Sequence, residues 1–89
     1  MPGNKNESPA AKAYTLSICP NSRKVRQFFQ EQRVPFSYID LDSASGEEQK
    51  HLMDEVFRLS GVRALPVVQV GRQVVLGWDE AKLRAALLP

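Results

Sequence analysis

Three prolines mark the points where the hydrophobic pattern of this 89-residue chain changes. Pro20 follows an alternating segment and opens a helical one, and proline favours the first turn of a helix because its φ angle suits that turn and its missing N–H is not needed there. Pro35 closes the helical segment, since the residue before a proline avoids helical angles. Pro66 directly precedes a run of branched residues, so we expect a strand to begin after it. The prolines therefore mark the start and the end of the first predicted helix and the start of the third predicted strand.

Hydrophobic periodicity between these boundaries predicts the order strand, helix, strand, helix, strand, strand, helix. The four predicted strands are 13–18, 36–41, 67–70 and 73–76. The three predicted helices run from Pro20 or Asn21 to a point before Pro35, from about Ser45 to Gly61, and over 80–87. A parallel strand–helix–strand unit and a terminal hairpin follow from this order. The prediction is an α/β fold, βαβαββα, whose four-stranded mixed sheet is flanked by helices on both faces.

Local end signals support these boundaries. Ser45 and Glu48 stand at the spacing of a capping box, and Gly61 suits the end of the second helix. Gly71-Arg72 suits a tight hairpin turn, and Asp79 is a natural N-cap for the last helix.

The composition predicts one compact domain and excludes several kinds of function. Residues 1–12 are expected to be a flexible tail, and residues 13–89 a domain. The net charge of +2 argues against nucleic acid, and no apolar run approaches the length of a membrane span. The N-terminus lacks the apolar core of a signal peptide, and the single cysteine cannot form an internal disulfide. The cytoplasm is therefore the expected location.

Cys19, the only cysteine, stands between the first predicted strand and the first predicted helix. N–H groups of the first helical turn and the helix dipole favour the thiolate at such a position, and the thiolate is the nucleophile. Arg23 and Lys24 are expected to add positive charge nearby. The alternative is an inert, buried cysteine. The neighbouring Pro20 and the helix start favour a catalytic Cys19.

Ser22 stands where a Cys-x-x-Cys motif has its second thiol. A hydroxyl cannot resolve a mixed disulfide, but it can donate a hydrogen bond to the Cys19 sulfur and stabilise the thiolate. The alternative is a serine that only satisfies backbone groups near the helix start. Both interpretations stay open, as does the question of whether serine is the native residue.

Two further segments are candidates for substrate binding. A cis bond between Leu65 and Pro66 would leave neighbouring backbone groups free to pair with an extended ligand, whereas a trans proline would only start the strand. Gly77, Trp78 and Asp79 precede the last helix, whose N-terminal N–H groups can bind an anion such as a carboxylate. The alternative is an N-cap aspartate beside a packing tryptophan. No metal is predicted, because His51 has no Cys or His partner at ligand spacing.

Three segments resemble glutaredoxins, over about residues 13–87 in total. They are the active-site segment YTLSICPNSRKV at 14–25, the cis-proline segment VRALPVV at 62–68, and the final segment VVLGWDEAKL at 74–83. The resemblance implies a thioredoxin-like fold and thiol–disulfide exchange with glutathione as co-substrate. It implies the following site: Cys19 as nucleophile; Pro20 beside it; Leu65 and Pro66 against the cysteinyl part of glutathione; Gly77, Trp78 and Asp79 against its γ-glutamyl group.

Two departures from the family pattern narrow this expectation. Because Ser22 replaces the second thiol, only a monothiol cycle with an external thiol is available. Leu16 and Ser17 occupy the region where many glutaredoxins carry a lysine, so Arg63 is the candidate for receiving a glutathione carboxylate. The predicted partners are glutathione or another low-molecular-weight thiol and protein disulfides, with no nucleic acid, no membrane and a monomeric chain.

Three hypotheses for function follow. The leading one is a monothiol glutaredoxin-like oxidoreductase that acts on glutathione mixed disulfides. A less favoured one is an iron–sulfur carrier, in which two chains share a cluster through Cys19 and glutathione. The third is a binding module that keeps the fold without redox turnover.

Overall fold

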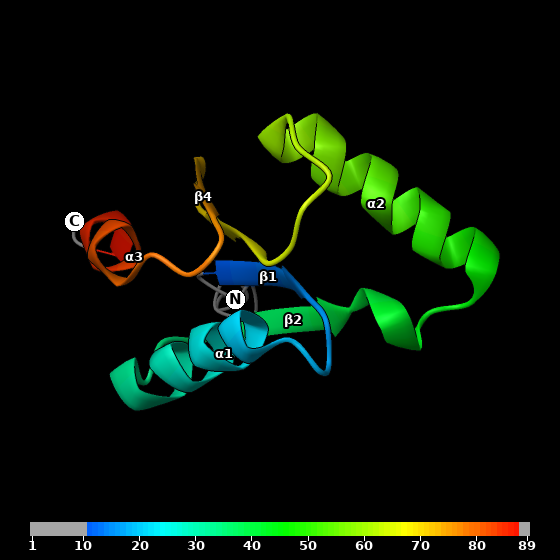
Figure 1. The fold of residues 1–89 in the computed structure, drawn as a ribbon. Helices are drawn as coiled ribbons and strands as arrows, with labels where there is room; N and C mark the ends of the chain where they lie inside the picture. The colour runs from blue at the N-terminus through cyan, green and yellow to red at the C-terminus, as the bar shows by residue number, and fades with distance from the viewer. Residues whose placement is uncertain (1–10, 88–89) are drawn as a thin grey trace, which may run out of the picture.

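The computed structural model describes residues 11–87, and its elements follow one another in the predicted order (Figure 1). The strands are β1 (Ala11–Thr15), β2 (Phe36–Asp40), β3 (Val67–Val70) and β4 (Gln73–Leu76). The helices are α1 (Pro20–Gln32), α2 (Gly46–Ser60) and α3 (Glu80–Leu87), and a short 3-10 helix, η2 (Leu41–Ser43), precedes α2. The predicted fold class is therefore confirmed.

The predicted helix ends are confirmed by their hydrogen bonds. The Ser45 hydroxyl accepts the Glu48 N–H at 3.3 Å, and Gly61 ends α2 with φ at 79°. The Asp79 carboxylate accepts the Lys82 N–H at 3.1 Å, as expected of the α3 N-cap. These features depend on residues a few positions apart, which is why the sequence alone predicts them.

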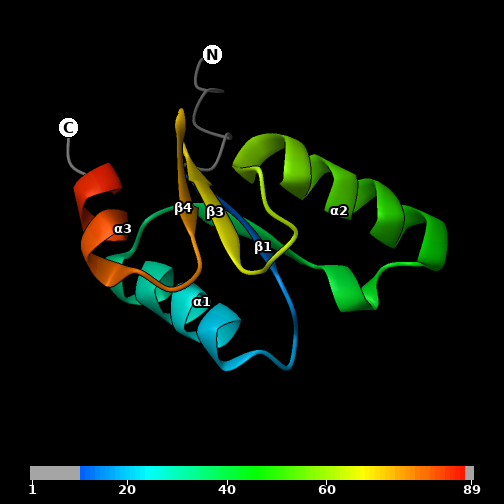
Figure 2. The same ribbon diagram turned by 45° about the horizontal axis from the view of Figure 1, so that its top comes forward.

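The four strands form one mixed sheet in the order β2-β1-β3-β4. β1 is parallel to β2 and antiparallel to β3, and β3 is antiparallel to β4. Helices α1 and α3 cover one face of this sheet and α2 covers the other (Figure 2). Because β1 is a central strand, its C-terminal end lies between its neighbours β2 and β3.

The first strand differs from its prediction at both ends. It includes Ala11 and Lys12, so the predicted tail of residues 1–12 is two residues too long, and residues 1–10 lie outside the described part of the chain. It ends at Thr15 and not at Ile18, whose side chain is 81% exposed. The last pairs of β1 are Thr15 with Asp40 and Tyr14 with Val67, and neither partner strand offers a further residue in register. Residues 16–18 are therefore a loop that leads into Cys19.

Candidate functional site

Cys19 occupies the N-cap position of α1. Its backbone is extended, with φ at −83° and ψ at 124°, and Pro20 follows at the first helical position. The Cys19 carbonyl accepts the Arg23 N–H at 3.0 Å, which is the first hydrogen bond of the helix. Cys19 is a free, partly exposed thiol. The structure thus places the only cysteine of the chain where the sequence predicts it, at the positive end of a helix.

The surroundings of Cys19 lower the pKa of its thiol. The Ser22 N–H makes the largest contribution, followed among the stabilising groups by the Ser22 hydroxyl, the Asn21 N–H and the positive charge of Arg26, while partial burial opposes them. Each of these groups favours the thiolate because it donates to, or attracts, negative charge on sulfur. The contributing cation is Arg26, and not Arg23 or Lys24 as expected from the sequence.

Ser22 satisfies a backbone group near the helix start, which is one of the two interpretations that the sequence left open. Its side chain is fully buried, and its oxygen accepts the Leu16 N–H at 3.0 Å. This hydrogen bond connects the loop before Cys19 to the first turn of α1. The same hydroxyl retains its proton for the Cys19 sulfur, which is consistent with its part in lowering the Cys19 pKa.

Arg26 is held beside the site by Asp40, at the end of β2. The Nη1 atom of Arg26 lies 3.2 Å from the Asp40 carboxylate, and the guanidinium carbon lies 5.0 Å from the centre of the Tyr38 ring. The hydroxyl of buried Thr15 donates to the same carboxylate at 2.6 Å. Sequence reasoning missed Arg26, although its position seven residues after Cys19 places both on one helix face.

The Leu65–Pro66 peptide bond is cis, as the resemblance implied. The Pro66 carbonyl accepts the Gly77 N–H at 2.8 Å, so the loop before β3 and the turn after β4 are joined. Within residues 11–87, Leu65 makes no backbone–backbone hydrogen bond. The backbone of Leu65 is therefore available to a bound chain.

Trp78 and Asp79 have structural partners of their own. The Trp78 ring packs edge-on against Phe28 of α1, with ring centres 5.8 Å apart, so this side chain belongs to the core around α1 and α3. Asp79 caps α3 through one carboxylate oxygen. These contacts match the packing and capping alternative from the sequence, and they leave the backbone of the turn as its candidate binding surface.

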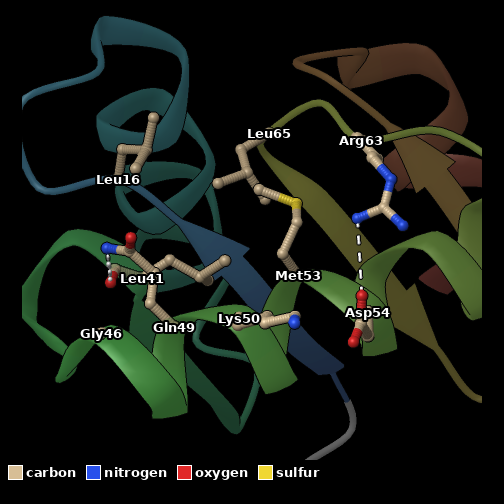
Figure 3. Close-up of a pocket in the computed structure, with 9 residues that line it drawn as sticks. All are labelled: Leu16, Leu41, Gly46, Gln49, Lys50, Met53, Asp54, Arg63 and Leu65. Carbon is tan, nitrogen blue, oxygen red and sulfur yellow. Dashed lines mark hydrogen bonds and ion pairs between the residues drawn. The ribbon is translucent and has the colours of Figure 1, made fainter.

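A cavity of about 560 Å³ lies between α2 and the loops before α1 and β3 (Figure 3). Its lining residues are Leu16, Leu41, Gly46, Gln49, Lys50, Met53, Asp54, Arg63 and Leu65. Arg63 is directed to α2, where it lies 3.5 Å from the Asp54 carboxylate and over the Phe57 ring. Lys50 is a second cation in this cavity, and sequence reasoning missed it because only the packing of α2 brings it near Leu16 and Leu65.

Neither a membrane helix nor a metal site is found in the described part of the chain. No helix within residues 11–87 is long and apolar enough to span a bilayer. The same residues include no group of three His, Cys, Asp or Glu side chains placed to hold a metal ion.

The mixed sheet, the cysteine at the start of α1 and the cis-proline before β3 define a protein of the thioredoxin-like class. The family model described as Glutaredoxin matches residues 11–75. The chain therefore belongs to the glutaredoxin family, and a thiol oxidoreductase type of function follows from this membership. No curated protein matches the sequence.

Solved structures agree with this assignment. A glutaredoxin from Archaeoglobus fulgidus is 32% identical, with a TM-score of 0.88 over 94% of this chain and 91% of that one. Methanoredoxin from Methanosarcina acetivorans is 24% identical, with a TM-score of 0.82 over 86% and 82%. A buckwheat glutaredoxin–glutathione complex is 20% identical, with a TM-score of 0.73 over 89% and 76%. The last two show the fold alone.

Proposed function

We propose that this protein is a glutathione-dependent thiol–disulfide oxidoreductase that works by a monothiol cycle with Cys19 as the nucleophile. The observation that carries the proposal is a partly exposed thiol with a lowered pKa in a chain that has no second cysteine. A lowered pKa increases the thiolate fraction at neutral pH, and thiolate is the attacking species. Family membership and the glutathione bound to the buckwheat relative support glutathione as co-substrate.

The cycle needs two thiol–disulfide exchanges. The Cys19 thiolate attacks the glutathione sulfur of a mixed disulfide, and the substrate sulfur leaves as a thiolate that takes a proton from water. A second glutathione thiolate then attacks the glutathione sulfur bound to Cys19, so oxidised glutathione leaves and the Cys19 thiolate returns. The hydrogen bonds from Ser22 assist this second step, because a stabilised thiolate is a better leaving group.

The residues around Cys19 suit the parts of glutathione. The free backbone of Leu65, before cis-Pro66, is placed to pair with the cysteinyl residue. The turn Gly77-Trp78-Asp79 presents the N-terminus of α3 to the γ-glutamyl carboxylate. Pro20 is exposed beside Cys19 and borders the bound chain.

The cavity beside α2 suits the glycine carboxylate of the same molecule. Arg63 and Lys50 supply its positive charge, although Asp54 competes for Arg63. Lys50 lies in the cavity with Leu16, which is in the region where many glutaredoxins have a lysine. We therefore assign the carboxylate to Lys50 together with Arg63.

The single cysteine and the need for a glutathione pool favour a cytoplasmic enzyme. Its substrates would be glutathionylated proteins and other mixed disulfides, and we propose that the chain acts as a monomer, since one Cys19 completes the cycle.

Turnover of the mixed disulfide between glutathione and 2-mercaptoethanol tests the proposal. With glutathione, glutathione reductase and NADPH present, we expect turnover by the wild-type chain and none by Cys19→Ser. Mass spectrometry after exposure to oxidised glutathione should show one added glutathione that excess glutathione removes. An unmodified Cys19, or equal rates for the two proteins, would contradict the proposed function.

A further inference from the structure

In the loop that leads to Cys19, Leu16 packs against the core beside α2, but the next two residues have little packing. Ser17 is exposed, and the Ile18 side chain is 81% exposed. A loop with so few buried contacts depends on hydrogen bonds for its conformation. The bonds that hold residues 16–18 therefore decide where Cys19 lies relative to the donors that stabilise its thiolate.

Asp42 holds this loop from the side of β2. One carboxylate oxygen accepts the Ser17 N–H at 3.0 Å, and the other accepts the Ser17 hydroxyl at 2.5 Å. Two bonds between the same two residues restrict both the position and the rotation of Ser17, which one bond would not do. Asp42 lies in η2, two residues after the end of β2, so the parallel pairing of β1 with β2 brings it to this loop.

The opposite side of the loop is held by α1. The Leu16 N–H donates to the Ser22 oxygen at 3.0 Å, and the Leu16 carbonyl accepts the Cys19 N–H at 3.3 Å. A displacement of Ser17 would move its neighbour Leu16, and with it the hydrogen bonds that Leu16 makes to the Ser22 oxygen and to the Cys19 N–H. The bonds from Asp42 thus reach Cys19 through Ser17 and Leu16.

Asp42 is a carboxylate at neutral pH. The Ser17 hydroxyl and then the Ser17 N–H hold its pKa below the usual range, because both donate to the charged form. A carboxylate that acted on Cys19 by charge alone would raise the thiol pKa, so its removal would lower that pKa. Positioning through Ser17 has the opposite sign: without the bonds the thiolate loses donors and its pKa rises. The two effects are therefore separable by experiment.

We propose that Asp42 is a positioning residue for Cys19, and that its two hydrogen bonds to Ser17 hold the loop in the conformation that keeps the Cys19 thiol reactive. The effect of Asp42 on turnover rests on the proposed function, whereas its effect on the reactivity of the Cys19 thiol does not.

The rate at which iodoacetamide alkylates Cys19, measured against pH, tests the inference without glutathione. Asp42→Ala removes both bonds, and we expect alkylation at pH 7 to be about threefold slower and the midpoint of the profile to rise by about half a unit. Asp42→Asn removes the charge but can still accept the Ser17 N–H and donate to the Ser17 oxygen, so it should restore most of the rate. Ser17→Ala, which loses one bond, should fall between wild type and Asp42→Ala.

The matched control is Glu47→Ala, which removes an exposed carboxylate from the first turn of α2 and should leave the profile unchanged. A lower or unchanged midpoint in Asp42→Ala would overturn the inference, and so would equal profiles for Asp42→Ala and Asp42→Asn. Thermal unfolding of each variant shows whether it is folded. If Asp42→Ala is not folded, the alkylation profile of Ser17→Ala tests the inference. Absence of glutathione turnover in the wild type alone would refute the proposed function and leave these results intact.

Discussion

The two faces of the sheet are packed very differently. On the face covered by α1 and α3, α1 buries Val25, Phe28 and Phe29, and the rings of Phe28 and Phe29 lie with centres 5.5 Å apart. On the other face, Val56 is the one fully buried residue of the whole length of α2. The 560 Å³ cavity also lies on this second face.

The better packed face supports Cys19, whereas the other face holds the proposed carboxylate site. Cys19 stands at the end of the better packed helix, so its donors are held in place by the core beneath them. Arg63 and Lys50, which we propose for the glycine carboxylate, are exposed and border the cavity on the other face. The proposed nucleophile and the proposed carboxylate site are therefore associated with differently packed faces of the sheet.

The largest expected effect comes from the α1 face. Phe29 is fully buried, and Phe29→Ala should lower the free energy of unfolding by about 3–5 kcal/mol, because it removes apolar contacts and leaves a cavity. Met53→Ala, in α2, is the matched variant on the other face. It should lower the free energy of unfolding by about 1 kcal/mol, since Met53 is only partly buried. Urea unfolding measures both. Equal losses would mean that the two faces are equally well packed.

An intermediate effect is expected at Ser22, where the packed face meets the thiol. Ser22→Ala leaves the Leu16 N–H without its partner and should lower the free energy of unfolding by about 1–3 kcal/mol. It also removes a donor from the thiolate, so the pKa of Cys19 should rise and alkylation at pH 7 should become slower.

The Cys19 thiolate makes the free energy of unfolding depend on pH, and Ser22→Ala should weaken this dependence. Because the folded-state pKa of Cys19 is lowered, the thiolate stabilises the fold above the unfolded thiol pKa, and this contribution is lost as pH falls through the folded pKa. Ser22→Ala should reduce that contribution. Ser37→Ala, at an exposed position of β2, is the control. An unchanged alkylation profile in Ser22→Ala would show that the hydroxyl has no part in thiolate stabilisation.

The smallest expected effect is at the open face. Lys50→Gln should raise the KM for the glutathione mixed disulfide about threefold, with kcat and the free energy of unfolding nearly unchanged, because it removes an exposed charge near the proposed position of the glycine carboxylate. Arg72→Gln, which removes an exposed charge from the turn between β3 and β4, is the control and should leave this KM unchanged. The difference between wild type and Lys50→Gln should shrink in high salt. A fall in kcat at constant KM would place Lys50 outside the binding surface.

Prediction from sequence succeeded where the deciding contacts are local. Pro20 and Cys19 at the start of α1, and the Ser45–Glu48 cap of α2, all depend on residues within one helical turn of each other. It failed at residues 16–18, where the alternating pattern continued but the partner strands did not. It also selected Arg23 and Lys24 instead of Arg26, because closeness along the chain is a poor guide to which cation faces the sulfur.

The sequence by itself determined the order of elements and the place of the only cysteine at the start of a helix, because both follow from hydrophobic spacing and from proline. The tertiary structure decided what surrounds that cysteine. The parallel pairing of β1 with β2 brings Asp42 to Ser17, 25 residues away in the chain. Asp40, at the end of β2, likewise meets Arg26, 14 residues away. The packing of α2 likewise brings Lys50 to the cavity beside Leu65. Contacts of this kind depend on the arrangement of the strands and helices, since no local pattern specifies which distant side chains will meet.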